Sequence, residues 1–296
     1  MTAPDQPSGR AWGRWAALFF VLLAASVLGI FPLRDLLRST LAPLRLITNE
    51  ATNERDWSED VARLPEARLR GDLLTVANLR NFDYRTVSEW TPRWEERTCD
   101  LRTVRSLWFV MEPFSPLLGA AHTFLSFGFA DGSYLAVSVE VRKVKGDSFS
   151  PWRALWRGFE IAYVLGDERD LVRLRTNYRH DEVYLYPAKA TPEQIRSLLL
   201  DVVERVSALR AKPEFYNTLT NTCATNILRH VNRVWPGRIP YGWRILMPAY
   251  SDRLAFDLGL IDHPGPFAEA RRRWRINDKA AAADQSPEFS RLIREP

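Results

Sequence analysis

The stretch NTLTNTCATNILRH, residues 217–230, places Cys223 at the start of an apolar pattern with helical spacing. Asn221 or Thr222 is suited to cap the first turn of this predicted helix, which Pro236 would end. The unpaired N–H groups and the dipole at a helix start stabilise an anion, so a thiol there has a lowered pKa. We therefore expect Cys223 to act as a nucleophile.

A cysteine nucleophile needs a base, and the chain has 4 histidines. His230 lies two turns along the same predicted helix, a rise of about 10 Å that puts it out of reach. His180 and His263 stand in polar turns, where a solvated histidine is expected. His122 instead opens an apolar strand pattern at residues 121–129 and is the candidate general base. The alternative for His122 is a half-buried histidine bonded to a backbone carbonyl.

The strand that begins with His122 continues across an Asp-Gly turn, residues 131–132, into a second alternating arm, which predicts a β-hairpin. With a three-residue loop His122 faces Glu140, and with a two-residue loop it faces Val141. In the first register Glu140 would orient the imidazole and complete a Cys–His–carboxylate set. Otherwise Glu140 is a surface carboxylate paired with a nearby cation.

The elements that would position these side chains predict an α+β domain with an antiparallel sheet packed on helices. Strand-like alternation predominates from Trp57 to about residue 187 and includes the segment DLVRLRTNYRHDEVYLYP, residues 170–187. Thr191 and Gln194 then form a capping box before a long amphipathic helix. The last sixty residues favour further helices and loops.

An apolar run without charges, residues 15–31, follows two arginines near the start of the chain. Its length approaches the ~20 residues that span a bilayer, and the arginines favour a cytoplasmic N-terminus. No clear cleavage site ends the run, so we favour an uncleaved anchor over a cleaved signal peptide. Residues 32–47 carry a leucine stripe suited to the membrane surface, and residues 49–60 predict a polar linker.

The formal net charge is +5, and arginine supplies most of the positive charge. This favours planar anions such as phosphate or carboxylate, which Arg142, Arg157, Arg169 or Arg175 could bind unless they form ordinary ion pairs. Nucleic acid is not expected, because the arginines are spread along the chain without the signature of a nucleic-acid module. No metal-ligand spacing occurs, and we expect neither a metal nor another cofactor.

The chain has 2 cysteines, and a single disulfide between Cys99 and Cys223 is the alternative to a free thiol in an exported protein. A domain of this size does not need such a bridge.

Several long segments resemble the DUF4105 family, which is named for the N-terminal periplasmic domain of the lipoprotein N-acyltransferase Lnb. The resemblance extends from about Trp57 to the C-terminus and is carried by NLRNFDYRT, AHTFLSFGF, SVEVRK, GDERDLVRLRT, PEFYNTLTNTCATN and WRILMPAYSDRLAFDLGLID. It implies a papain-like fold similar to permuted NlpC/P60-like thiol enzymes, in which the histidine strand precedes the cysteine helix. It also implies Cys223 as nucleophile, His122 as general base and acid, and Glu140 as the orienting carboxylate.

Enzymes of this kind would take an acyl chain from a lipoprotein as a thioester and pass it to an amine. The oxyanion of that reaction needs N–H donors, for which the backbone amides of Thr222 and Cys223 are candidates. Asn217 or Asn221 could add a side-chain donor, although a capping role for Asn221 is the alternative. Arg142 could bind a phosphate or carboxylate of the substrate. Lnb carries further membrane helices that have no counterpart in this sequence, which leaves the acyl acceptor open.

We therefore expect residues 1–14 in the cytoplasm, residues 15–33 across the inner membrane, residues 34–56 as a juxtamembrane helix and linker, and residues 57–296 as an Lnb-like periplasmic domain. The leading hypothesis is a thiol acyltransferase or lipid esterase acting on lipoprotein or phospholipid. One alternative is an NlpC/P60-like cell-wall amidase or peptidase, which would need a wide polar cleft instead of an apolar acyl slot. The other is a non-catalytic envelope scaffold with an inert cysteine.

Overall fold

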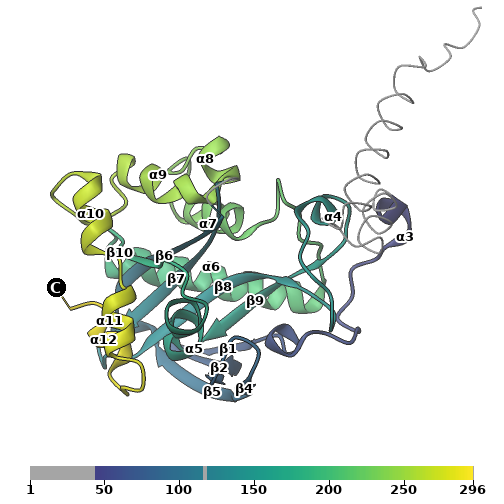
Figure 1. Cartoon of the computed structure of the whole chain (residues 1–296), viewed down its shortest axis with the longest axis horizontal. Coiled ribbons are helices and arrows are strands. Elements are labelled where there is room, and N and C mark those ends of the chain that lie inside the picture. Colours follow the sequence, from purple (N-terminus) through teal and green to yellow (C-terminus); the bar gives the residue numbers. More distant parts are fainter. Residues whose placement is uncertain (1–43, 116–118, 296) are drawn as a thin grey trace, which may run out of the picture.

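An eight-stranded sheet runs through the middle of the protein (Figure 1). The computed structural model describes residues 44–115 and 119–295, so the predicted membrane anchor lies outside the described residues. The strand order is β1-β2-β9-β8-β7-β6-β10, and β5 also pairs with β2. All pairings are antiparallel except one parallel pair between β2 and β9. The strands of this sheet are β1 Glu66–Arg70, β2 Leu73–Arg80, β5 Trp94–Asp100, β6 Val104–Ser115, β7 Ala120–Phe129, β8 Tyr134–Arg142, β9 Glu160–Gly166 and β10 Tyr184–Pro187.

A small second sheet pairs β3, Asp83–Tyr84, with β4, Trp90–Thr91. The α-helices are α3 Arg45–Thr48, α4 Pro151–Leu155, α5 Glu168–Arg173, α6 Pro192–Ala211, α7 Cys223–Val234, α8 Trp243–Leu246, α9 Ser251–Asp257, α10 Phe267–Arg273, α11 Asn277–Ala282 and α12 Phe289–Leu292. Short 3-10 turns are η2 Glu59–Val61, η3 Leu101–Thr103 and η5 Pro248–Tyr250, and η4, Leu174–Tyr178, is a π-helical turn. The architecture is α+β, as the sequence predicts.

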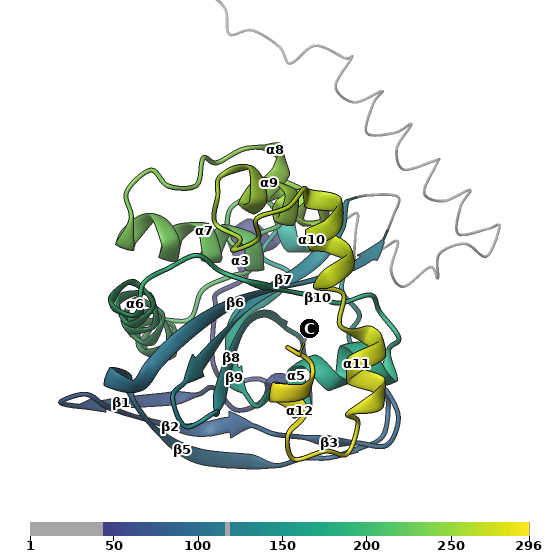
Figure 2. The same ribbon diagram turned by 90° about the vertical axis from the view of Figure 1, so that its left-hand side faces the viewer.

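Helices cover both faces of the sheet. On one face α6 and α7 pack on the odd-numbered side chains of β7, such as Leu125 and Phe127. On the other face α5, α11 and α12 pack around Phe124, which belongs to the alternate set. Figure 2 shows α6 and α7 on the side of the sheet opposite α5, α11 and α12. Because strand side chains alternate, neighbouring residues of β7 reach different layers.

The β7–β8 hairpin has the three-residue register that sets His122 opposite Glu140. The ladder runs from Phe124–Ser138 to Gly128–Tyr134, and Phe129 and Ser133 close the loop with a backbone hydrogen bond. Gly132 adopts a φ of 82°, the positive value that this turn requires. The two-residue loop, which would set His122 opposite Val141, is therefore excluded.

The strand predicted within residues 170–187 is wrong over its first half. Asp167 accepts a hydrogen bond from Arg169 N and caps α5, and the chain continues as the π-helical turn η4. The alternation of apolar residues and arginines suggested an exposed strand face. In the structure Arg173 and Arg175 are buried, because each is paired with carboxylates or carbonyls, so hydrophobicity alone misassigned this segment.

The two helices predicted around the candidate site are confirmed. α6 opens with a capping box formed by Thr191 and Gln194, and α7 begins at Cys223 with Thr222 as its N-cap. Cys99 and Cys223 are both free and buried, so the alternative of a disulfide between them is excluded. Among residues 44–115 and 119–295, no helix has the length and hydropathy needed to cross a membrane.

Candidate active site

The start of α7 brings Cys223 against β7 at the end of its ladder with β8. That ladder ends at Phe124 and Ser138, two residues before His122, and α7 contacts both strands. The thiol of Cys223 lies within electrostatic range of the His122 imidazole and of the Thr123 backbone. The buried hydroxyl of Thr123 has no hydrogen-bond partner among the described residues.

A reciprocal capping box fixes the first turn of α7. Thr222 Oγ1 accepts from Thr225 N at 3.2 Å, and Thr222 N donates to Thr225 Oγ1 at 2.7 Å. The backbone N–H group of Thr222 therefore already donates a hydrogen bond, which corrects the expectation that it donates to an oxyanion. Within the described part of the chain, the N–H groups of Cys223 and Ala224 have no acceptor. They are the backbone donors that remain at this helix start.

Cys223 and His122 stabilise each other's charged forms. Burial opposes the thiolate, but the hydrogen bond and charge of His122, with help from Thr123, outweigh it and lower the pKa of Cys223. Burial also opposes the imidazolium, but Glu140 and Cys223 together raise the pKa of His122 to about 10. Each group therefore favours the charged form of the other, which is the direction that a cysteine nucleophile requires.

Ser138 links His122 to Glu140. Its hydroxyl lies 2.6 Å from His122 Nε2 and donates to Glu140 Oε1 at 2.6 Å, while the direct Nε2–Oε1 distance is 3.3 Å. Since the hydroxyl donates to the carboxylate, it accepts the Nε2 proton, which leaves Nδ1 for the thiol. Glu140, the carboxylate predicted to orient the imidazole, lies near it, and the shorter contacts between them pass through Ser138.

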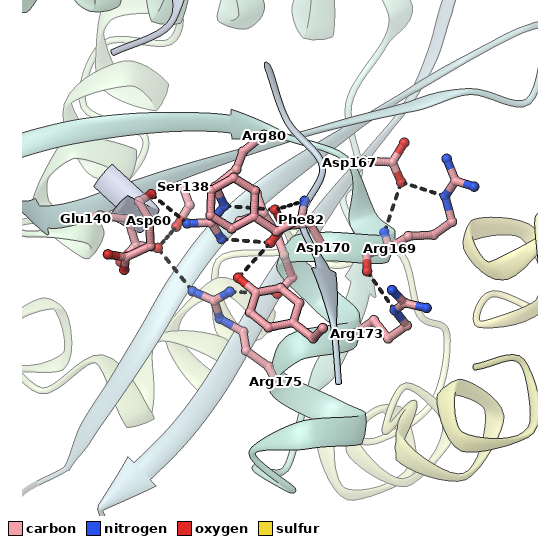
Figure 3. A network of polar contacts seen from close by, with 12 residues as sticks. Asp60, Arg80, Phe82, Ser138, Glu140, Asp167, Arg169, Asp170, Arg173 and Arg175 are labelled. Atoms are coloured by element: carbon pink, nitrogen blue, oxygen red, sulfur yellow. Dashed lines mark hydrogen bonds and ion pairs between the residues drawn. The ribbon is translucent and has the colours of Figure 1, made fainter. Parts of the chain in front are cut away.

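Arg175 holds the carboxylate of Glu140 in place. Its Nη2 donates to Glu140 Oε1 at 3.1 Å, and its Nε donates to Glu112 Oε2 at 2.6 Å. Figure 3 shows Arg175 and Ser138 converging on Glu140. Burial works against ionisation of Glu140, but His122, Arg175 and Ser138 outweigh it and hold its pKa well below the usual range. The carboxylate therefore stays charged behind the imidazole.

A second buried ion pair, between Arg80 and Asp170, lies beside this one (Figure 3). Arg80 donates twice to Asp170, at 2.9 and 2.8 Å, and both side chains are almost completely buried. Asp170 also accepts from Phe82 N at 2.8 Å, and Arg80 donates to the carbonyl of Asp60. This pair ties β2 to α5 and supports the helix that carries Arg175 toward the site.

Other predicted substrate-binding side chains have structural partners. Asn217 Oδ1 accepts from the backbone of Leu219 and Thr220 and forms the turn before α7. Asn221 Nδ2 donates to the carbonyl of Phe215, and its Oδ1 accepts from Asn226 and Arg229, so Asn221 is neither the N-cap nor a free donor.

Arg142 is not open to a substrate either. Its guanidinium donates to Val61 O, Ala62 O and Asn53 Oδ1, and it stacks 4.3 Å from the ring of Trp57. It therefore fixes the segment before β1, and the structure does not bring it to the site.

His230 is a buried histidine whose two ring nitrogens both contact other side chains of the core. Its Nδ1 lies 2.6 Å from Asp201 Oδ2, and its Nε2 lies 2.6 Å from the hydroxyl of Tyr163. Burial lowers the pKa of His230 despite Asp201. It stays neutral in the core and has no contact with the thiol.

Sequence reasoning missed Thr123, Ser138 and Tyr216 as members of the site, and it considered Arg175 only as a candidate to bind an anion. The burial of Tyr216 together with the nearby charges of Cys223 and Glu140 raises the pKa of its hydroxyl, which places it beside the pair. Ser138 carried a signal, because a three-residue hairpin loop puts it two residues from Glu140 on the same strand face. The others depend on the packing of separate layers.

An apolar cavity of about 300 Å³ lies between the sheet and the helices α7, α8 and α9. Side chains of β6 and β7 also line it, and its lining includes Thr123 and Ala224, the chain neighbours of His122 and Cys223, but neither His122 nor Cys223. Its polar lining includes Lys189 and Arg238. A cavity of this size lies at the lower end of the range for small-molecule sites, so it suits one narrow apolar group.

A more open polar cleft lies beside the turn that leads to α7. Arg157, Glu214, Asn217, Asn221 and Arg229 are among its lining residues. This cleft is lined mainly by polar side chains, whereas the cavity lined by Thr123 and Ala224 is mainly apolar. No group of acidic, cysteine and histidine side chains suited to a metal ion is found within the described ranges.

The fold and the site together define an α+β protein with a buried, charge-paired thiol at a helix start. A family model for the Lnb N-terminal periplasmic domain matches residues 90–249, more than half of the chain, and the chain belongs to this family. The matched region includes His122, Ser138, Glu140 and Cys223. The description of the family indicates a periplasmic location. No curated protein and no solved structure matches the chain.

Proposed function

We propose that this protein is a membrane-anchored periplasmic thiol acyltransferase or lipid esterase that forms an acyl-cysteine at Cys223. Its substrate would be a lipoprotein or phospholipid acyl ester. The observation that carries the proposal is the apolar cavity, whose lining includes Ala224 and Thr123, the chain neighbours of Cys223 and His122. A polar substrate would gain nothing from that lining, whereas an acyl chain would bury its apolar surface there.

In the first step the Cys223 thiolate attacks the ester carbonyl carbon and forms a tetrahedral oxyanion. The N–H groups of Cys223 and Ala224 are the donors available to that oxyanion. As the carbon–oxygen bond breaks, His122 gives its Nδ1 proton to the departing alkoxide. The products are an acyl thioester at Cys223 and a lyso-lipid.

In the second step an amine or a water molecule attacks the thioester, and neutral His122 accepts its proton at Nδ1. The carbon–sulfur bond breaks and restores the thiolate, releasing an amide if the acceptor is an amine or a fatty acid if it is water. Ser138 and Glu140 keep the imidazole oriented through both steps and stabilise its positive charge.

Family membership supports a role in lipoprotein processing. The order of His122 on a strand before Cys223 on a helix agrees with the DUF4105 resemblance and with a permuted NlpC/P60-like, papain-like fold. The proposed topology has residues 1–14 in the cytoplasm, residues 15–33 in the inner membrane, residues 34–56 as the juxtamembrane part and residues 57–296 in the periplasm.

A cell-wall amidase or peptidase is the second candidate, and the polar cleft lined by Asn217 and Arg229 favours it. A peptide stem would lie in that cleft and present an amide carbonyl to the same thiol. The first candidate is preferred because the cleft does not include Thr123 or Ala224, whereas the apolar cavity does.

The test is intact-protein mass spectrometry of the full chain in detergent after brief exposure to a diacylated lipopeptide, a phospholipid or a muropeptide. We expect a covalent acyl adduct at Cys223 with a lipid ester, together with release of the lyso product. Cys99→Ala should keep this adduct, and Cys223→Ala should lose it. Cleavage of the muropeptide with no adduct from either lipid would favour the amidase, and no reaction with any of the three would reject both candidates.

A further inference from the structure

A row of exposed apolar side chains runs along one border of the protein. Trp243 and Tyr241 are 58% and 57% exposed, and Leu219, Leu46 and Leu44 are exposed to a similar degree. Figure 1 shows α8, α4 and α3 along this border, opposite β1 and β5. Large exposed aromatic and aliphatic side chains gathered on one border mark an interaction surface.

Hydrogen bonds make this border continuous although its parts are distant in sequence. The Tyr241 hydroxyl donates to the carbonyl of Leu219 at 2.7 Å, joining the segment before α8 to the turn before α7. Thr218 Oγ1, in the same turn, donates to the carbonyl of Pro151 in α4 at 2.7 Å. Beyond α4, Arg157 Nη1 donates to the carbonyl of Leu46 in α3 at 2.9 Å.

Parts of this border are linked to the candidate active site and to the apolar cavity. Leu219 stands four residues before Cys223 in the chain. In α8, Trp243 is exposed, whereas Ile245 is 5% exposed and lines the apolar cavity. α8 therefore has one side chain toward the cavity and another toward the surroundings.

Two observations indicate that a lipid bilayer covers this border. The row is rich in Trp and Tyr, and Trp243 packs edge-on against Tyr250, a combination of side chains favoured at the interface between lipid and water. The described part of the row begins at Leu44, and in the sequence residues 32–43 lie between Leu44 and the apolar run predicted to span the membrane. A segment of that length reaches at most roughly 40 Å when fully extended.

We propose that Leu44, Leu46, Leu219, Tyr241, Trp243 and Tyr250 form an interfacial ridge that lies in the headgroup region of the bilayer. Because Ile245 of α8 lines the apolar cavity, a ridge in this position lets a single acyl chain pass from the lipid along α8 without crossing water. This docking is independent of whether Cys223 accepts an acyl chain.

The test measures lipid contact in the full chain, reconstituted into vesicles of phosphatidylethanolamine and phosphatidylglycerol. An environment-sensitive fluorophore is attached at Leu219→Cys or Trp243→Cys in a Cys99→Ala, Cys223→Ser background. Leu69→Cys is the matched control, because Leu69 is an exposed leucine of β1 on the opposite border. We expect several-fold stronger quenching by nitroxide-labelled lipid at positions 219 and 243 than at position 69.

Equal weak quenching at all three positions would overturn the proposal. Shielding of positions 219 and 243 from a water-soluble quencher without quenching by lipid would also overturn it, since a second copy or another protein would then cover the ridge. The background has no nucleophilic thiol, so the result does not depend on catalysis. Thermal melting of each labelled variant checks that it is folded.

Discussion

The hydroxyl of Ser138 lies 2.6 Å from Nε2 of His122 and donates a hydrogen bond to Glu140 Oε1, so it links the carboxylate to the imidazole. Glu112 is the residue directly opposite His122 in the β6–β7 ladder, yet its carboxylate is bound by Arg175. Arg175 thus binds the carboxylates of both Glu112 and Glu140. Cys223, His122, Ser138 and Glu140 form a series of side chains in which each interacts with the next.

Removal of Glu140 or Ser138 should move the alkaline limb of the pH profile of kcat/KM. A protonated His122 stabilises the thiolate, and Glu140 and Cys223 raise the pKa of His122 to about 10. Glu140→Gln or Ser138→Ala removes a group that favours the protonated ring, so the limb should shift to lower pH. For Ser138→Ala, loss of one charge-assisted hydrogen bond predicts a shift of about one to two pH units. The measurement is kcat/KM against pH with a soluble ester.

His230→Asn is the control for that experiment, because His230 is buried but has no contact with the thiol. It should leave the alkaline limb unchanged even if it lowers the melting temperature. An unshifted limb in Glu140→Gln would show that the carboxylate does not govern the imidazole.

Iodoacetamide should distinguish the two cysteines. Both are buried, but burial raises the pKa of Cys99 to about 11, whereas His122 lowers that of Cys223. Across pH 5 to 9 we expect labelling at Cys223, still fast below the ~8.5 of a free thiol, and none at Cys99. His122→Ala should slow it sharply. A Cys223 that labels only at alkaline pH in the unaltered protein would argue for an inert scaffold.

The capping box of α7 should matter to both stability and reactivity. Thr222→Ala removes the bond to Thr225 N and should cost about 1 kcal/mol of unfolding free energy. It also loosens the turn that holds Cys223, so labelling of Cys223 should slow. Thr191→Ala removes the corresponding cap of α6 and should cost a similar amount with no change in labelling. Equal effects of both variants on labelling would assign the change to global destabilisation.

The Arg80–Asp170 pair should be a strong determinant of stability. Arg80→Met leaves the buried Asp170 carboxylate without its partner, and we expect a loss of about 3–5 kcal/mol in urea unfolding. The exposed pair of Arg85 and Glu89 is the comparison, since Arg85→Met should cost about 0–1 kcal/mol. Similar losses for the two variants would mean that the buried carboxylate finds another partner or a proton.

The apolar cavity should set acyl-chain selectivity. Val231 lines it on α7, and Val231→Phe would fill part of its volume. We expect kcat/KM for p-nitrophenyl octanoate to fall several-fold, while that for the acetate stays close to the unaltered value. The acetate is the internal control, because its chain does not enter the cavity. Equal losses with both esters would point to damage at the thiol.

Local patterns in the sequence predicted much of this arrangement. The Asp-Gly turn supplied the hairpin register, and the helix signals around Thr222 and Pro236 placed Cys223 at a helix start. These features depend on neighbours within a few residues, which a sequence displays. The pairing of His122 with Glu140 followed from the register alone.

The remaining parts depend on contacts between layers, which the sequence does not display. Arg175 was predicted in a strand and is instead in η4, where it reaches two carboxylates on β6 and β8. Arg142 was considered as a substrate-binding cation or as part of an ordinary ion pair, but in the structure it donates to two backbone carbonyls and to Asn53 Oδ1. A buried arginine and an exposed one look the same in a sequence, because only the partners differ.

His122 and Cys223 come from a strand and a helix that are far apart in the chain, and they meet only after α7 has docked on the sheet. Contacts of such long sequence separation form late relative to hairpins and single helices. The lowered thiol pKa should therefore be absent from early folding intermediates and appear when the two layers join. Pulse labelling of Cys223 during refolding would therefore report when α7 docks on the sheet.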